Sequence, residues 1–238
     1  MRDTDRDWQH YGAFEPYYGV LTHERFLRAN LTPETLEEFW ASGRVTVQHV
    51  WSMMERLFGY PRPRSALDFG CGVGRLTHGM CDLADEVIGL DVSTAMVREA
   101  ERHGRDNARF VTDLPDCRFD WINSFIVFQH IPPSRGYDLL EQLLRGAADT
   151  CLLSLHFTFF KDAQCLSDHA LSATRFGTWD GQTMRPILPI IADDAMMMMY
   201  DYDLTKLYAI LLHHRFTKIY LDHTDHGGAQ GAIILAAR

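Results

Sequence analysis

The chain has 238 residues, 46% of them hydrophobic, which suffices for one large domain, or one domain with an extension, around a substantial core. Its formal net charge is −9, from 23 basic and 32 acidic residues, and it holds no basic run, so we expect no nucleic-acid partner. Five scattered cysteines, a charged beginning and the lack of a bilayer-length apolar run predict a reduced, cytoplasmic protein with no membrane partner.

Residues 1–62 are expected to form a helical N-terminal extension, or lid, ahead of the main domain. The stretch 8–20 is rich in aromatic residues but lacks clear helical periodicity. We predict that this stretch closes over a bound ligand, with Tyr17 and Tyr18 as substrate-binding residues. The alternative is a cap that packs on the edge of the sheet.

Two helices are predicted in the rest of this extension. Thr32 is a favourable N-cap and Pro33 a favourable first helical residue, so one helix begins there and is expected to end near Gly43. A second helix with one apolar face follows, and Pro61 and Pro63 end it.

Residues 63–238 are predicted to form one α/β domain that opens with a strand over 65–69 and a glycine-rich turn. Gly70, Gly72 and Gly74 permit backbone conformations closed to other residues and allow a ligand close to the main chain. The dinucleotide fingerprint G-x-G-x-x-G is not met, because its last glycine position is occupied by Arg75. The alternative is an ordinary tight turn between strand and helix.

A second strand is predicted over 86–90, and the acid Asp91 follows it directly. A carboxylate at the end of the second strand can accept hydrogen bonds from both hydroxyls of a ribose. Asp91 could instead cap the next helix, but Ser93 is the better N-cap.

The run Asp68–Gly74 follows the pattern D-x-G-x-G-x-G, and with Asp91 it resembles motif I and the ribose-binding acid of the class I S-adenosylmethionine (SAM) methyltransferases. The extension is similar to that of small-molecule bacterial members. The resemblance implies a Rossmann-like α/β fold, with a mostly parallel seven-stranded sheet, helices on both faces and an antiparallel terminal strand. It implies SAM as cofactor, bound by Asp68, Gly70, Cys71, Gly72, Gly74, Asp91, Val92, Asp113, Leu114 and Ser124.

Further elements are predicted in the order expected for this fold. Strands are expected at 109–112, 119–125 and 150–155, and helices at 135–146, capped by Ser134, and at 204–214. A hairpin over 216–221 and 231–236 turns at Gly227 and Gly228. The insertion at 157–200 is expected to form a substrate wall with the lid, and core packing or an oligomer interface competes for its Met196–Met199 run.

Catalytic candidates follow the predicted fourth and fifth strands. The segment 124–132 resembles motif IV but lacks the N/D-P-P-Y/F signature, which argues against methylation of DNA or of glutamine. His130 is the candidate general base, because histidine titrates near neutrality, and a helix-capping or packing role is the alternative. Gln129 is a predicted substrate contact, and His156 is a second catalytic candidate.

The predicted function is methyl transfer from SAM to a hydroxyl or amine of a small molecule such as a natural product or sugar. The alternatives are a methyltransferase acting on RNA or protein, and a SAM-binding protein without catalysis. His213 and His214, with the run 222–226, could suggest a metal site, but that run falls in the predicted hairpin and is expected to be a solvated turn, so no metal is expected. The sequence leaves open a homodimer, the acceptor, and the choice between O- and N-methylation.

Overall fold

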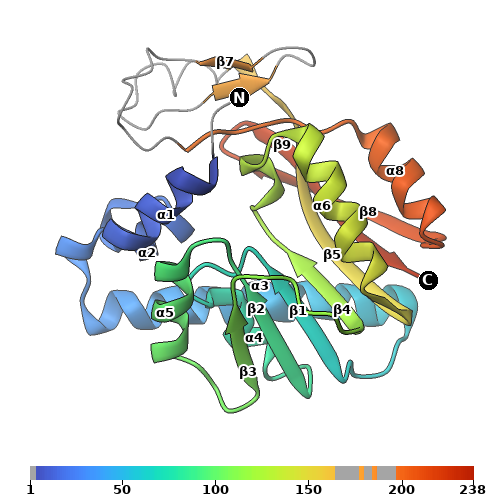
Figure 1. Ribbon diagram of the computed structural model, residues 1–238, viewed down its shortest axis with the longest axis horizontal. Helices are drawn as coiled ribbons and strands as arrows, with labels where there is room; N and C mark the ends of the chain where they lie inside the picture. Colours follow the sequence, from blue (N-terminus) through green and yellow to red (C-terminus); the bar gives the residue numbers. More distant parts are fainter. Residues whose placement is uncertain (1–3, 164–176, 180–183, 187–196) are drawn as a thin grey trace. The chain divides into compact units, whose positions relative to one another are not determined.

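The computed structural model describes residues 4–163, 177–179, 184–186 and 197–238 (Figure 1). It divides into two compact units, one of residues Asp5–Asn123 and the other of Met1–Thr4 with Ser124–Arg238. The N-terminal helices therefore belong to the same unit as the glycine turn. Among the described helices, none has the length and apolar character that crossing a membrane requires.

The sheet of the unit 5–123 is parallel. Its strands lie in the order β3 (Ala108–Val111), β2 (Glu86–Leu90), β1 (Ser65–Phe69) and β4 (Phe119–Ser124). Phe69 pairs with Leu90, and Leu90 pairs with Val111, so these three strands end together at one edge of the sheet. Helices α4 (Arg75–Met80) and α5 (Thr94–Arg102) provide the crossovers that parallel strands need.

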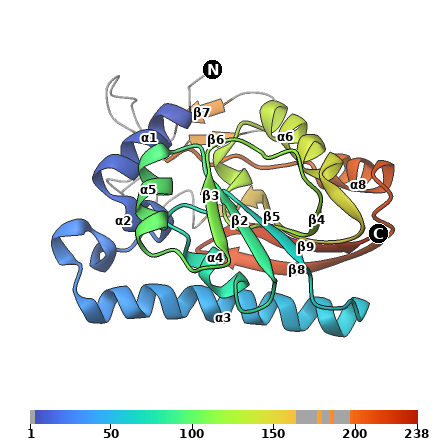
Figure 2. The same ribbon diagram turned by 60° about the horizontal axis from the view of Figure 1, so that its bottom comes forward.

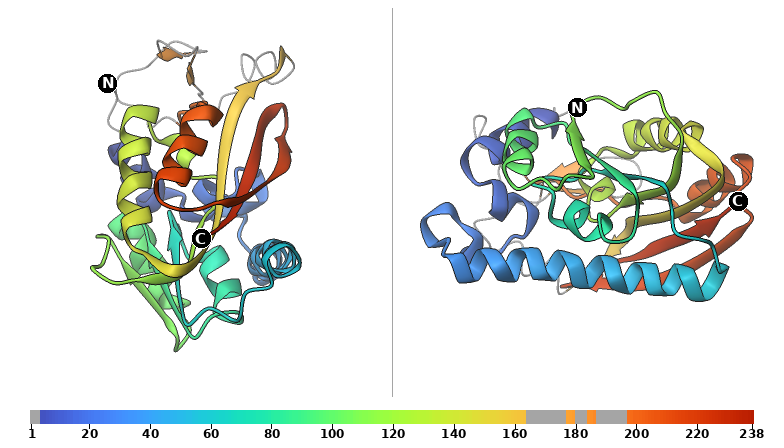
Figure 3. Two further views of the ribbon diagram at one scale, coloured as in Figure 1. Left: turned by 90° about the vertical axis from the view of Figure 1, so that its right-hand side faces the viewer. Right: turned by 90° about the horizontal axis from the view of Figure 1, so that it is seen from below.

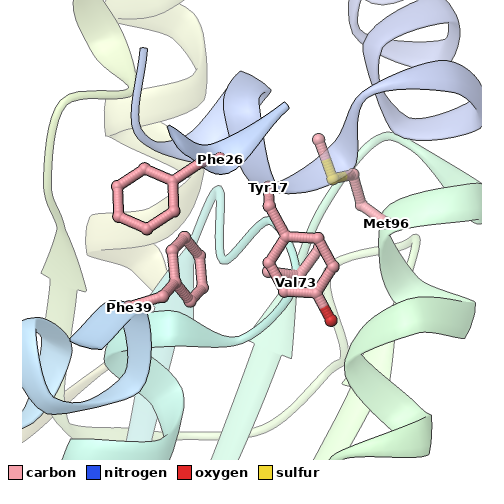
Figure 4. Close-up of a cluster of buried hydrophobic side chains, with 5 residues drawn as sticks. All are labelled: Tyr17, Phe26, Phe39, Val73 and Met96. Atoms are coloured by element: carbon pink, nitrogen blue, oxygen red, sulfur yellow. The ribbon is translucent and has the colours of Figure 1, made fainter. Parts of the chain in front are cut away.

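The first residues are more regular than their sequence indicates. They form helices α1 (Thr4–Phe14) and α2 (Pro16–Val20), followed by two 3₁₀ turns, η1 (Glu24–Phe26) and η2 (Arg28–Asn30). The side chains that stabilise this region form one buried cluster with the main domain, drawn in Figure 4: Tyr17, Phe26, Phe39, Val73 and Met96. Helical periodicity is weak here because the apolar residues pack against several elements rather than along one face.

Helix α3 (Pro33–Phe58) is a single helix of 26 residues, which extends along the unit in Figures 2 and 3. The predicted start is confirmed, with Thr32 as N-cap and Pro33 in the first turn. The predicted end near Gly43 is wrong. Gly43 lies inside the helix and is buried against α4. A Cβ atom at this position would collide with the backbone carbonyl oxygen of Arg75, so the glycine permits close packing of α3 on α4.

In the unit 124–238 the strands are antiparallel, in the order β5 (Ala147–Lys161), β9 (Ala229–Ala237) and β8 (Lys218–His226). The left view of Figure 3 shows the red β8–β9 hairpin beside the long yellow β5. Gly227 and Gly228 have φ values of 64° and 87°, which suit a two-residue turn between twisted strands. The predicted hairpin and antiparallel terminal strand are confirmed.

Helices α6 (Pro133–Arg145) and α8 (Leu204–His213) belong to this unit, as does a small pair of strands, β6 (Gly177–Trp179) and β7 (Met184–Pro186). The helix α8 is confirmed, whereas Ser134 lies inside the first turn of α6 and is not its cap. The segment 157–161, expected to begin an insertion, continues β5. Most of the predicted insertion, with Met196, lies outside the described residues.

Candidate active site

The glycine turn after β1 adopts the conformations its sequence demands. Gly70, Gly72 and Gly74 have φ values of 73°, 55° and 87°, a region that strains residues carrying a Cβ atom. The N–H groups of Gly70 and Cys71 both donate to the carbonyl oxygen of Leu90, at 2.7 and 3.0 Å. The turn is therefore fixed against the end of β2.

Asp91, directly after β2, connects the turn to the next helix. Its Oδ2 accepts from the N–H of Gly72 at 2.8 Å, and its Oδ1 accepts from the N–H of Ser93 at 2.8 Å. Ser93 in turn caps α5. Each carboxylate oxygen has two acceptor positions, so one on each remains for a ligand with two neighbouring hydroxyls. Burial raises the pKa of Asp91 to about 6, although two backbone N–H groups favour its charged form.

Asp68 is buried beneath the turn. Its Oδ2 accepts from the Thr77 hydroxyl at 2.6 Å and its Oδ1 from the Asn123 amide at 2.8 Å. These bonds join the end of β1 to α4 and β4. Burial raises the pKa of this carboxyl group. The contacts place Asp68 as a residue that positions the turn.

The ends of β2 and β3 carry the other predicted cofactor residues. Val92 and Leu114 remain 38% and 37% exposed, although both are large and apolar, and Asp113 is exposed beside Leu114. Exposed apolar side chains at this edge suit a planar base. Cys71 differs, because its side chain lies in a buried cluster with Val97, Ala100 and Phe110, so only its backbone borders the turn.

The N-terminal helices lie against the same edge of the unit 5–123. A Cβ atom on Gly72 would come within 2.6 Å of Val20 Cγ2, and Gln9 Nε2 donates to the carbonyl oxygen of Val92 at 2.8 Å. The Tyr17 hydroxyl donates to Glu99 on α5 at 2.9 Å and lies 3.1 Å from His103 Nε2. Tyr17 is buried and fastens α2 to α5, whereas Tyr18 is half-buried.

The unit 124–238 begins at the end of β4. Ile126, two residues on, has a φ of 59°, which is strained for a β-branched residue and of a kind that clusters at functional sites. The 3₁₀ turn η3 (Phe128–His130) follows. Among the residues of this unit that the structure describes, three buried polar atoms have no hydrogen-bond partner: Ser124 Oγ, Gln129 Oε1 and His156 Nδ1.

His130 is 5% exposed and both its ring nitrogens are engaged. Nδ1 lies 2.7 Å from the carbonyl oxygen of Met198, which only accepts, so Nδ1 carries the proton. Nε2 then accepts from the Gln129 amide nitrogen at 3.1 Å. Burial lowers the pKa of His130 to about 4. The imidazole therefore holds both the methionine segment and Gln129, a pairing across 68 residues of sequence that no local pattern signals.

His156, on β5, is fully buried. Its Nε2 lies 3.0 Å from the Thr224 hydroxyl on β8, and burial lowers its pKa to about 3. The rings of Phe125 and His226 lie against it, with centroids 5.3 and 5.1 Å away. The sequence reading missed His226 and Thr224, because it took the run 222–226 for a solvated turn rather than part of β8.

Parts of the chain are similar to known methyltransferases. Residues 66–149 match the family described as "Methyltransferase domain". The malonyl-[acyl-carrier protein] O-methyltransferase of Pseudescherichia vulneris is 29% identical over 160 residues, which are 59% of this chain and 64% of that protein. The alignment thus spans somewhat less than two thirds of that relative's length.

Solved structures show the same fold. Magnesium protoporphyrin IX methyltransferase from Synechocystis, with bound S-adenosylhomocysteine (SAH), is similar with a TM-score of 0.64 and 19% identity, covering 99% of this chain and 100% of that one. The 1,6-didemethyltoxoflavin N1-methyltransferase of Burkholderia thailandensis gives a TM-score of 0.52 and 15% identity, over 87% and 91% of the two chains.

The fold is that of the class I methyltransferases, with four parallel strands and an antiparallel end, as the sequence predicts. The family match over residues 66–149 and the similar solved structures agree with the resemblance of motif I to that of the SAM-dependent methyltransferases. Within the described residues, no group of histidine, cysteine or acidic side chains is arranged to hold a metal ion.

Proposed function

We propose that this protein transfers the methyl group of SAM to a hydroxyl or amine of a small molecule. The observation that carries the proposal is the carboxylate of Asp91, which is fixed by the N–H groups of Gly72 and Ser93 and keeps one acceptor position on each oxygen. This arrangement fits the two ribose hydroxyls of the cofactor.

The other residues of the same unit suit the remaining parts of SAM. The main chain at Gly70, Gly72 and Gly74 allows close approach of the methionine part. Val92 and Leu114 suit the faces of the adenine, and Asp113 its amino group. Asp68 and Cys71 act by holding the turn, one through Thr77 and Asn123 and the other through its buried side chain. Ser124, the last residue of β4, belongs to the other unit, and its hydroxyl is without a partner.

The bound cofactor would supply a sulfonium methyl group, whose carbon would bond to a nucleophile placed in line with the C–S bond while that bond breaks and SAH leaves. The protein's contribution is to hold the acceptor in that line and to exclude water, and orientation of this kind accounts for much of an enzyme's acceleration. His130 is poorly suited to remove a proton in this structure, because its Nε2 already accepts from Gln129 and its pKa is about 4. We assign it the positioning of Gln129 instead.

His156 is the better candidate for direct contact with the acceptor. Its Nδ1 is buried and unpartnered, and the Thr224 hydroxyl fixes the opposite side of the ring. In the tautomer with its proton on Nε2, which the Thr224 hydroxyl can accept, Nδ1 can accept a hydrogen bond from an acceptor hydroxyl or N–H group and so orient the attacking atom.

Similar proteins support a small acceptor. Their names include an N1-methyltransferase of 1,6-didemethyltoxoflavin and a methyltransferase of magnesium protoporphyrin IX. The net charge of −9, without a basic run, argues against nucleic acid as the acceptor.

The test is a turnover assay that follows SAH formation with a panel of hydroxyl and amine metabolites, a short RNA and a protein extract. We expect turnover with a small acceptor, and its loss in Asp91→Ala. Turnover with the RNA or the extract alone would support the alternative substrates, and SAH binding without any turnover would support a non-catalytic protein.

A further inference from the structure

Three rings from three elements form a compact cluster in the unit 124–238. Phe125 follows β4, His156 lies on β5 and His226 ends β8. The centroid of Phe125 lies 5.3 Å from that of His156 and 6.1 Å from that of His226, and the two imidazoles are 5.1 Å apart. His226 is exposed and His156 is fully buried, so the cluster extends from the surface to the interior.

Buried polar atoms without hydrogen-bond partners belong to this cluster and to residues near it in the chain. His156 Nδ1 belongs to the cluster, Ser124 Oγ belongs to the residue before Phe125, and Gln129 Oε1 belongs to an amide oriented by His130. His130 lies near enough to His156 to lower its pKa. A buried polar atom without a partner is destabilising, and three such atoms among the described residues of this unit indicate that a ligand supplies the missing partners.

The charges near this cluster restrict the ligand. The Lys161 ammonium is buried at the end of β5, but it binds Asp201 at 2.6 Å. Burial lowers the pKa values of His130, His156 and His226, so none of these rings carries a positive charge at neutral pH. A carboxylate or phosphate placed here would lose its hydration without gaining a free cation among these side chains.

We propose that Ser124, Gln129 and His156 bind an uncharged, planar acceptor through its hydroxyl or ring N–H group, and that Phe125 and His226 contact its flat face. Aromatic rings favour such contacts at centroid distances like those within this cluster. The inference rests on the proposed function, and it names the substrate class: phenols and neutral nitrogen heterocycles rather than carboxylates.

A matched pair of probes tests this on the full chain with saturating SAH. The neutral probe is 2-naphthol and the anionic probe is 2-naphthoate, which has the same ring system. Binding is followed by titration, and the contact is located from the imidazole ¹⁵N signals of His156. We expect 2-naphthol to bind at least about tenfold more tightly than 2-naphthoate and to shift the Nδ1 signal, because a single hydrogen bond lost without replacement lowers affinity by roughly tenfold.

Three histidine variants test whether His156 and His226 contact the probe. His156→Leu and His226→Ala should each weaken 2-naphthol binding, whereas His213→Ala, an exposed histidine on α8, should not. His226→Ala removes an exposed side chain, so its effect is readable even if His156→Leu does not fold. SAH affinity should be unchanged in all three variants.

The outcomes separate the two claims. Failure of the wild-type chain to bind SAH would contradict the proposed function. The assignment of the acceptor class would be overturned if the chain binds SAH normally but binds 2-naphthoate more tightly than 2-naphthol, or binds neither probe. It would also be overturned if His226→Ala and His156→Leu leave 2-naphthol binding unchanged.

Discussion

Asp91 shows how a single residue combines a sequence signal with an environment that only the fold reveals. Its place after an apolar strand predicts a ribose contact, and the structure gives it two backbone donors and a raised pKa of about 6. In the proposed site, ribose hydroxyls would donate to this carboxylate, so cofactor binding would favour the ionised form. The charge of Asp91 would then be linked to cofactor affinity.

SAH affinity should fall as the pH drops below about 6, by up to about tenfold per pH unit, because protons then compete with the ligand for Asp91. Calorimetric titrations from pH 7.5 to pH 5 measure this, with Asp91→Asn as the control. That variant should bind more weakly and lose this component of the pH dependence. An affinity that is constant across the range would contradict the role of Asp91.

His130 illustrates the opposite case, a residue whose chemistry suggested catalysis and whose contacts indicate structure. Substitution of alanine would leave the Met198 carbonyl and the Gln129 amide without a partner in the interior. We expect His130→Ala to lower the free energy of unfolding by about 1–3 kcal/mol, measured by chemical denaturation. His213→Ala, at the surface, should change it by less than about 0.5 kcal/mol. Unchanged stability with turnover reduced by roughly 10² or more would restore His130 as the base.

At the scale of elements, α1 and α2 contact the residues that we assign to the cofactor. Val20 lies on Gly72, Gln9 binds the Val92 carbonyl, and Tyr17 is fastened to Glu99. A ligand at the glycine turn would therefore stabilise these helices directly, as expected if residues 8–20 form a lid.

Hydrogen exchange in residues 8–20 should slow when SAH binds. Tyr17→Phe should raise the exchange of α2 in the free protein, because it removes the hydroxyl that donates to Glu99. Phe14→Leu, at a side chain 60% exposed, is the control. Exchange that is identical with and without SAH would make these helices a structural cap only.

The packing of α3 on α4 depends on the absence of one side chain. Gly43→Ala would place a methyl group against the Arg75 carbonyl oxygen, and overpacking of this kind costs about 1–3 kcal/mol. Thermal or chemical unfolding would measure the loss against Val45→Ala, since Val45 is 70% exposed on the same helix. Equal stability of the Gly43→Ala variant and the parent protein would show that α3 can shift away from α4.

At the scale of the molecule, the sequence predicted what depends on local patterns. The glycine turn, Asp91, the Thr32 cap and the Gly227–Gly228 hairpin all follow from neighbouring residues. Contacts between distant segments were not predictable in this way. The helices α1 and α2, the continuity of α3 through Gly43, and the contacts of His156 with Thr224 and His226 depend on partners far away in the chain.

The central claim is that the glycine turn and Asp91 form the cofactor site of a methyltransferase. Isothermal titration of the full chain with SAH, with NAD as the competing nucleotide, tests it most directly. We predict that the chain binds SAH and not NAD. SAH affinity should fall about tenfold or more in Asp91→Ala, because a charged acceptor of two hydroxyls is lost, and should be unchanged in the exposed control Asp106→Ala. Binding of NAD in place of SAH, or SAH binding that Asp91→Ala leaves intact, would contradict the account.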